Sequence, residues 1–205
     1  MLARKTFFEA VRVSLFDGVL KRRQVIGLTA ILDRAGVAAG IDDRWLAYML
    51  ATAHHETGRT IQPVRETFAK SDARAIALLD SAFDNGRLPS VSVRYWRRDA
   101  EGKSWLGRGL VQLTHRVNYE KMALATGIDL ISRPERAMEM AVAADILFIG
   151  MQTGAFTGRR LGQYFSADHE DWTGARRIIN GRDRAELVAG YGRRYLAAIR
   201  QARVE

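Results

Sequence analysis

The stretch WLAYMLATAHHETG, residues 45–58, decides the fold more than any other part of the chain. Its residues are apolar nearly all round a helix, which is the pattern of a helix buried on every side. Asp42 or Asp43 can cap its amino-terminal end, and Gly58 is suited to end it. We therefore predict a buried central helix over residues 42–57.

Helical patterns also dominate the rest of the chain. Each expected helix is marked by capping residues, by a glycine where it ends, or by a periodic apolar stripe. The expected helices cover residues 6–16; residues 21–35, ending at Gly36; a segment opened by Ser71 and stopped at Asn85 and Gly86; a segment opened by the capping box of Ser132, Pro134 and Glu135 and running to about Met151; and a last segment opened by Asp183 and Glu186.

Residues 91–113 have a different composition, rich in β-branched and aromatic side chains. Glu101 and Gly102 suit the turn of a small hairpin. Alternation along residues 110–114 would direct Gln112 and Thr114 to one face of a short strand. With no internal repeat and no linker-like segment, we predict a single, mainly α domain over residues 1–205 with a small β-hairpin.

Composition limits the chemistry that is open to the chain. There is no cysteine among the 205 residues, which excludes disulfides and thiolate metal sites. The net charge of +9 favours anionic partners such as nucleic acid, anionic lipid or a carboxylate-rich polymer, although a basic surface can also serve solubility alone. Glu9 and Arg12 interrupt what would be the apolar core of a signal peptide, and the apolar run 141–151 is too short to span a bilayer. We therefore expect no signal peptide and no membrane insertion.

Glu56 and Glu66 are the candidate catalytic pair. Glu56 ends the apolar stripe of the central helix, where burial disfavours a charged carboxyl group and suits a general acid. On one continuous helix Glu66 would lie about 15 Å further along the axis, but Gly58 and Pro63 should break the helix and let the chain return. An inverting glycosidase needs its two carboxyl groups roughly 6.5–9.5 Å apart. Arg65 would help to keep Glu66 ionised, although either glutamate taken alone fits a surface residue better.

Three blocks of sequence resemble signatures of the family 19 chitinases and the related phage and bacterial endolysins. HHETG at 54–58, followed by QPVRE at 62–66, resembles the paired-glutamate signature. GRGLVQLTHRVNY at 107–119 and RRIING at 176–181 resemble the second and third signatures, in the family's order. The resemblance implies a lysozyme-like, largely helical fold with a cleft between two lobes. It also implies hydrolysis of β-1,4 links between N-acetylated sugars with inversion at the anomeric carbon.

The resemblance assigns roles residue by residue. Glu56 matches the general acid and Glu66 the base that activates water, while Thr114 matches a hydroxyl that holds this water. Val117 departs from the family, because many members have an aromatic residue there. The other implied substrate-binding or supporting positions are His55, Gln112, Asn118 and Asn180, and the supporting arginine of the family has four candidates, Arg182, Arg184, Arg193 and Arg194.

Two alternatives stay open at this point. Trp105 can stack on the apolar face of a sugar, or it can be a tryptophan of the core. The substrate can be peptidoglycan, whose stem-peptide carboxylates suit a cationic enzyme, or neutral chitin. In the first case the resemblance implies an endolysin that is made in the cytoplasm and reaches the cell wall through a membrane lesion formed by a holin. We expect a monomer that needs no metal and no cofactor, since the two-carboxylate mechanism calls for neither.

Functions of other classes fit less well. A zinc protease needs His-Glu-x-x-His, and the last position is occupied by Arg59. A DNA-binding helical protein is permitted by the arginine pairs, but they are scattered rather than gathered in one recognition helix. A wall-binding protein with a dead active site is disfavoured by the presence of both glutamates.

Overall fold

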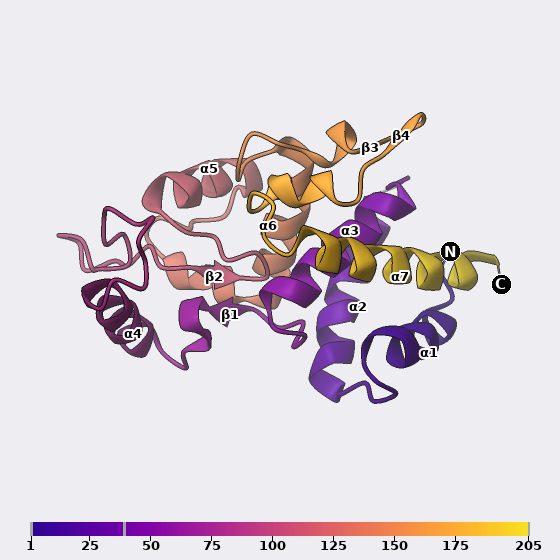
Figure 1. The fold of residues 1–205 in the computed structure, drawn as a ribbon, viewed down its shortest axis with the longest axis horizontal. Coiled ribbons are helices and arrows are strands. Elements are labelled where there is room, and N and C mark those ends of the chain that lie inside the picture. The colour runs from indigo at the N-terminus through magenta and orange to yellow at the C-terminus, as the bar shows by residue number, and fades with distance from the viewer. Residues whose placement is uncertain (1, 39, 205) are drawn as a thin grey trace.

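The computed structural model describes residues 2–38 and 40–204, and its fold is mainly helical (Figure 1). The structure also has two short antiparallel strand pairs, β1 with β2 and β3 with β4. The expected mainly α fold class is therefore confirmed. No helix in the described ranges is long and apolar enough to cross a membrane. The elements are α1 (Arg4–Leu15), α2 (Arg22–Val37), α3 (Asp43–Glu56), β1 (Val64–Arg65), η1 (Glu66–Phe68), α4 (Asp72–Asp84), β2 (Arg108–Gly109), α5 (Arg116–Thr126), η2 (Pro134–Met138), α6 (Met140–Thr153), η3 (Leu161–Gln163), β3 (Phe165–Ser166), β4 (His169–Glu170), η4 (Gly174–Ile178) and α7 (Ala185–Val204).

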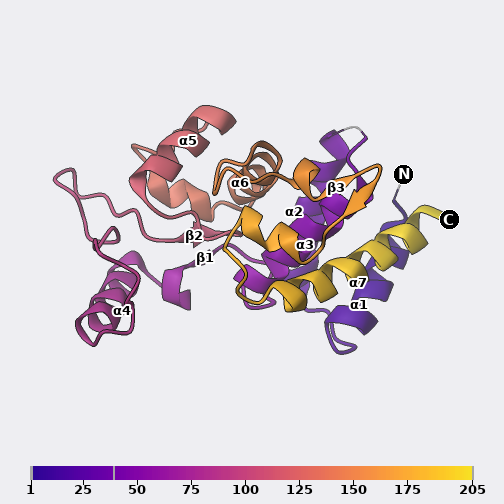
Figure 2. The ribbon, with the colours of Figure 1, turned by 45° about the horizontal axis from the view of Figure 1, so that its top comes forward.

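Helix α3 is the centre of the main core, as its sequence predicts. Residues 46–54 are all buried, and the Asp42 side chain caps the helix by accepting a hydrogen bond of 2.8 Å from the backbone N–H of Arg44. Helix α7 packs along α3 and α1 packs on α7, as Figure 1 and Figure 2 show. The helix that carries Glu56 is therefore held from several sides.

A second, smaller hydrophobic cluster forms the other lobe. Its buried members are Ala75 and Leu79 of α4 together with Trp96 and Leu106. Helix α4 is opened by Ser71, whose side chain accepts a hydrogen bond from Arg74 N–H, as expected. In Figure 1 this lobe lies at one end of the molecule, and β1 and β2 lie between it and the main core.

The small hairpin is not where the sequence predicts it. A turn does form at Glu101 and Gly102, because Asp99 accepts hydrogen bonds of 3.0 Å from the N–H groups of Glu101 and Lys103, but no strand flanks it. Strand β2 instead pairs with β1, far earlier in the chain. The aromatic residues that suggested strands pack into the second cluster, with Trp96 buried there.

The expected strand over residues 110–114 is a tight turn. Arg108 and Leu113 face each other as an isolated bridge, and Gln112 between them has a positive φ of 54°. The segment therefore reverses direction at once, which brings Thr114 back beside the strand that the chain has just left.

Two predicted helix starts also differ from the structure. Pro134 does open η2, but there is no capping bond from a side chain, and Glu139 is extended and separates η2 from α6. The single helix expected up to Met151 is thus two helices. Helix α7 begins at Ala185, after the expected opening residue Asp183. Glu186, in its first turn, accepts a hydrogen bond of 3.1 Å from the Thr173 hydroxyl and so ties the helix to the preceding segment.

Gly27 of α2 fixes how closely that helix approaches the loop after α3. A Cβ atom at this position would lie 1.8 Å from the carbonyl oxygen of Ile61. We predict that Gly27→Ala lowers the free energy of unfolding by about 1–3 kcal/mol through overpacking, measured by urea denaturation. Gly36→Ala in the same helix meets nothing within 4 Å and should stabilise the protein slightly. Equal effects of the two changes would contradict this packing.

Candidate active site

Glu56 is held at the end of α3 by a buried arginine. Arg176 Nη1 donates a hydrogen bond of 2.6 Å to Glu56 Oε1, and the two side chains are 2% and 15% exposed. Arg176 Nε also donates to the carbonyl of Asp183 at 2.9 Å. Breaking a buried ion pair by removing one partner typically costs about 3–5 kcal/mol. The pair therefore fastens η4 and the turn before α7 to the carboxyl end of α3.

Glu66 is held by Tyr95 of the other lobe and by Gly107, the residue before β2. The Tyr95 hydroxyl donates to Oε1 at 2.6 Å, and the N–H of Gly107 donates to Oε2 at 2.8 Å. Burial, together with the bond to Glu66, raises the pKa of Tyr95 well above its ordinary value, so that this hydroxyl stays a donor. Arg65 does not support Glu66, because it pairs with Asp72 at 2.6 Å. That expectation is wrong.

The side chains of Glu66, Gln112 and Thr114 all lie close to Gly107. A Cβ atom there would lie 2.8 Å from Gln112 Oε1, 3.2 Å from Thr114 Cγ2 and 3.3 Å from Glu66 Cβ. Gln112 donates to the carbonyl of Val64 at 3.1 Å, which anchors its amide to β1. The structure thus brings Glu66, Gln112 and Thr114 together, although the tight turn rather than a strand does so.

Asn118 braces this group from α5. Its side-chain amide donates to the carbonyl of Thr114 at 2.9 Å. Asn118 therefore supports the Thr114 backbone and so acts on Glu66 only indirectly.

The loop between the two glutamates returns as the sequence predicts. The ring of Phe68 would lie 3.3 Å from a Cβ atom on Gly58, so the chain just after Glu66 touches the chain just after Glu56. Positive φ angles occur at four non-glycine residues of this returning segment, namely Arg59, Ile61, Thr67 and Phe68. Such angles cost of order 1–3 kcal/mol each and tend to cluster at functional sites.

The remaining predicted positions have mixed outcomes. Trp105 is buried, 5% exposed, with its indole N–H bonded to Asp99 at 3.0 Å, so the structure favours the alternative of a core tryptophan over sugar stacking. His55 is half-buried, and burial lowers its pKa, with the charge of Glu56 acting in the opposite direction. Asn180 has an exposed side chain, and its backbone N–H donates to the carbonyl of Arg176 at 2.9 Å.

Sequence reasoning missed two residues that touch the glutamates. Arg176 is the first residue of the RRIING block, so the sequence block that resembles the family's third signature did contain the arginine that pairs with a glutamate. The four arginines proposed for this role, Arg182, Arg184, Arg193 and Arg194, pair with no glutamate among the described residues. Tyr95 gave no signal, because its approach to Glu66 depends on how the irregular segment before Trp96 folds over α4. Arg176 moreover supports Glu56 and not Glu66.

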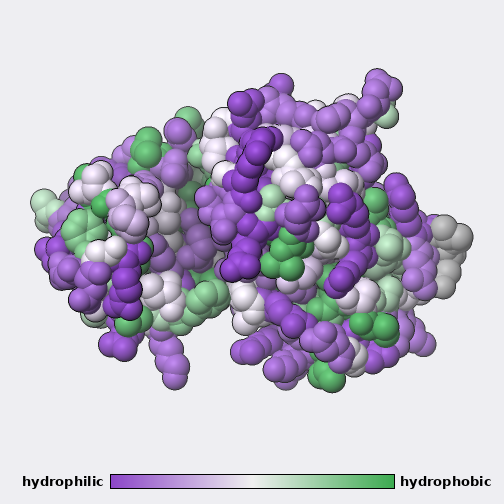
Figure 3. Space-filling view, viewed as in Figure 1, coloured by the Kyte–Doolittle hydropathy of each residue, from purple (hydrophilic) through white to green (hydrophobic). Residues whose placement is uncertain are grey.

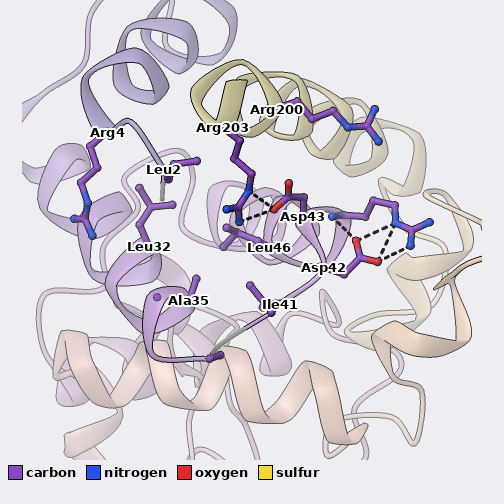
Figure 4. A pocket seen from close by; sticks show the side chains of 14 residues that line it. Leu2, Arg4, Leu32, Ala35, Ile41, Asp42, Asp43, Leu46, Arg200 and Arg203 are labelled. Atoms are coloured by element: carbon purple, nitrogen blue, oxygen red, sulfur yellow. Dashed lines mark hydrogen bonds and ion pairs between the residues drawn. The ribbon is translucent and has the colours of Figure 1, made fainter. Parts of the chain in front are cut away.

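A hollow of about 980 Å³ lies at the opposite end of α3 (Figure 4). Leu32, Ile41 and Leu46 line it, and Arg203 pairs with Asp43 at its edge at 2.7 Å. Asp43 begins α3 and Glu56 ends it, which separates the two by about 20 Å at a rise of about 1.5 Å per residue. This hollow is therefore not part of the glutamate site.

Within residues 2–38 and 40–204, no three His, Asp or Glu side chains converge in a way that could hold a metal ion. Comparisons with models of protein families, with curated proteins and with solved structures found no match to this chain.

His54, next to the site residues, lies in the core. Burial lowers its pKa to about 3, and its Nδ1 lies 3.0 Å from the Tyr195 hydroxyl. Its ring packs against Tyr191 in a tilted arrangement, with the ring centroids 4.4 Å apart. The first histidine of the HHE sequence is thus a neutral packing residue.

This burial predicts a loss of stability in acid. The unfolded chain takes up a proton on this histidine below its ordinary pKa of 6.5, whereas the folded chain does so only near pH 3. Stability should therefore fall as the pH drops through this window, by about 2 kcal/mol at pH 5 from His54 alone. Urea unfolding at pH 7 and pH 5 should show a smaller drop for His54→Gln than for the wild type. The exposed His169→Gln variant should keep the full drop, and an unchanged drop in His54→Gln would contradict the assignment.

Proposed function

We propose that this protein hydrolyses β-1,4 glycosidic bonds of bacterial peptidoglycan by inversion, with Glu56 as general acid and Glu66 as general base. The observation that carries the proposal is that the chain after Glu66 returns to the chain after Glu56, while each carboxyl group is fixed by a different kind of donor. The contact of Phe68 with Gly58 brings the two segments together. The resemblance of three sequence blocks to family 19 enzymes and endolysins points in the same direction.

The partners of each carboxyl group support the assignment of roles. Glu66 accepts hydrogen bonds from the Tyr95 hydroxyl and the Gly107 N–H, and a carboxylate suits both donors and can still take a proton from water. Glu56 uses only Oε1 in its bond to Arg176, so Oε2 is available to carry a proton. Two carboxyl groups in different environments are the arrangement that acid–base catalysis requires.

The reaction then balances as follows. Glu56 Oε2 gives its proton to the glycosidic oxygen as the bond to the anomeric carbon breaks. Glu66 takes a proton from a water molecule whose oxygen bonds to that carbon from the opposite face. Arg176 stabilises the carboxylate that Glu56 becomes, and Thr114 beside Glu66 offers a hydroxyl to the water.

Charge favours peptidoglycan over chitin as the substrate. The protein carries a net charge of +9, and peptidoglycan bears stem-peptide carboxylates whereas chitin is neutral, so long-range attraction favours the former. Acting on the wall after synthesis in the cytoplasm would call for a membrane lesion such as a holin makes. Chitin hydrolysis is the alternative that uses the same residues.

Glu56→Gln is predicted to remove catalysis. The amide cannot supply the proton, so release of reducing ends from purified peptidoglycan should fall by about a thousandfold. Glu66→Gln should cause a similar loss. The control is Glu9→Gln, an exposed glutamate of α1 that pairs with Arg12, which should keep wild-type activity.

A soluble chitin derivative assayed in parallel separates the candidate substrates. Activity on chitin alone would keep the mechanism and replace the substrate. No release from either polymer by a folded protein would contradict the enzymatic function and favour a wall-binding or DNA-binding protein.

Tyr95→Phe is predicted to lower kcat about tenfold with little change in KM. Tyr95 is proposed to position Glu66 and not to contact the substrate. A hydrogen bond to a charged group contributes about 1.5–3 kcal/mol. Tyr164→Phe is the matched control, since the Tyr164 hydroxyl has no hydrogen bond within the described part of the chain. A change in KM with kcat preserved would contradict the positioning role.

A further inference from the structure

A hollow of about 710 Å³ lies at the turn between η4 and α7. Three arginines line it, Arg177 from η4 and Arg182 and Arg184 from the turn. Strongly hydrophilic residues cover the middle of the face shown in Figure 3, where Figure 1 draws this turn. The hollow is therefore a concentrated cationic feature of the surface.

These three guanidinium groups are not neutralised within the described residues. Other arginines of the surface do form ion pairs, for example Arg94 with Asp80 and Arg203 with Asp43. Arg177, Arg182 and Arg184 form no ion pair or side-chain hydrogen bond in the ranges 2–38 and 40–204. Arg184 also holds a positive φ of 56°, a conformation that non-glycine residues adopt at a cost.

Two carboxylates also line the hollow, and both are engaged elsewhere. Asp171 accepts a hydrogen bond of 2.7 Å from the N–H of Gly174, and Glu186 accepts one of 3.1 Å from the Thr173 hydroxyl. Both bonds tie these carboxylates to the η4 segment, opposite the turn. Three cations against two bonded carboxylates leave the hollow with a positive balance.

Arg176 links the turn beside the hollow to Glu56. Arg176, which pairs with Glu56, precedes Arg177 in η4, and its Nε donates to the carbonyl of Asp183, between Arg182 and Arg184. The charges of Glu56 and Arg184 both act on the ring of His55. The turn that carries Arg182 and Arg184 is therefore bonded to the residue that holds Glu56, which lets a polymer bound at Glu56 extend toward this hollow.

We propose that this hollow is a subsite for a carboxylate of the peptide stem of peptidoglycan, bound by Arg177, Arg182 and Arg184. The inference rests on the proposed function, because it places the glycan at Glu56. Guanidinium groups bind carboxylates through paired, charge-assisted hydrogen bonds. Chitin has no peptide stem, so this subsite would give the protein a preference for peptidoglycan that does not depend on overall charge.

The test is a binding measurement that needs no catalysis. The probes are a soluble disaccharide that carries its stem peptide and the same compound with its stem carboxylates converted to amides. Calorimetry should show that the wild-type protein binds the carboxylate form about tenfold more tightly, the sum of a few partly exposed charge pairs. The combined variant R177Q/R182Q/R184Q should bind both forms with the same weaker affinity.

The control is R22Q/R87Q/R200Q, which removes the same charge from exposed arginines that do not line this hollow and should keep the tenfold preference. Equal binding of the two probes by the wild type, no binding of either, or a preference that survives in R177Q/R182Q/R184Q would overturn the subsite. Hydrolysis of peptidoglycan is assayed separately: activity without a preference overturns the subsite alone, and a preference without activity overturns the proposed function alone.

Discussion

The burial of α3 is the constraint on which the rest of the structure depends. Its residues 46–54 are all buried, so the surrounding helices must enclose them. Helix α7 does so by packing along α3. A helix held in this way cannot shift along its axis without exposing apolar surface, at about 25 cal/mol per Å². Glu56 is the last residue of that helix, so the packing of the core fixes the position of its backbone.

The Glu66 side depends on a different set of contacts. Asp72, in the first turn of α4, pairs with Arg65 of β1 and with the buried Arg108 of β2. These bonds fasten the second cluster to the strand pair, and Gly107, just before β2, then holds the Glu66 carboxylate. One glutamate thus belongs to the main core and the other to the junction between the two clusters, so the spacing of the carboxyl groups depends on how the clusters pack.

The sequence predicted those features of the fold that depend on residues close together in the chain. The buried helix, its Asp42 cap, the Ser71 cap and the return of the chain after Gly58 all follow from neighbouring residues, and the structure has them. The strand pair β1–β2 and the bond from Tyr95 to Glu66 join segments distant in sequence, and no local pattern encodes them. The hairpin prediction failed for the same reason, since Trp96 is buried by tertiary packing and not by a strand.

Polar contacts fix both glutamates of the proposed catalytic pair. Arg176, Tyr95 and the Gly107 N–H each orient one carboxyl oxygen, and each restricts which oxygen can exchange a proton. In the proposed mechanism, preorganisation of this kind would position the acid and the base for a displacement at one carbon.

The most direct measurement is the anomeric configuration of the first product. Proton NMR during cleavage of a β-1,4-linked N-acetylated oligosaccharide follows the new reducing end before it equilibrates in water. An inverting mechanism forms the α-anomer first, because water attacks the anomeric carbon from the face opposite the leaving oxygen. Initial formation of the β-anomer would show retention and contradict the assignment of Glu66 as a base acting on water.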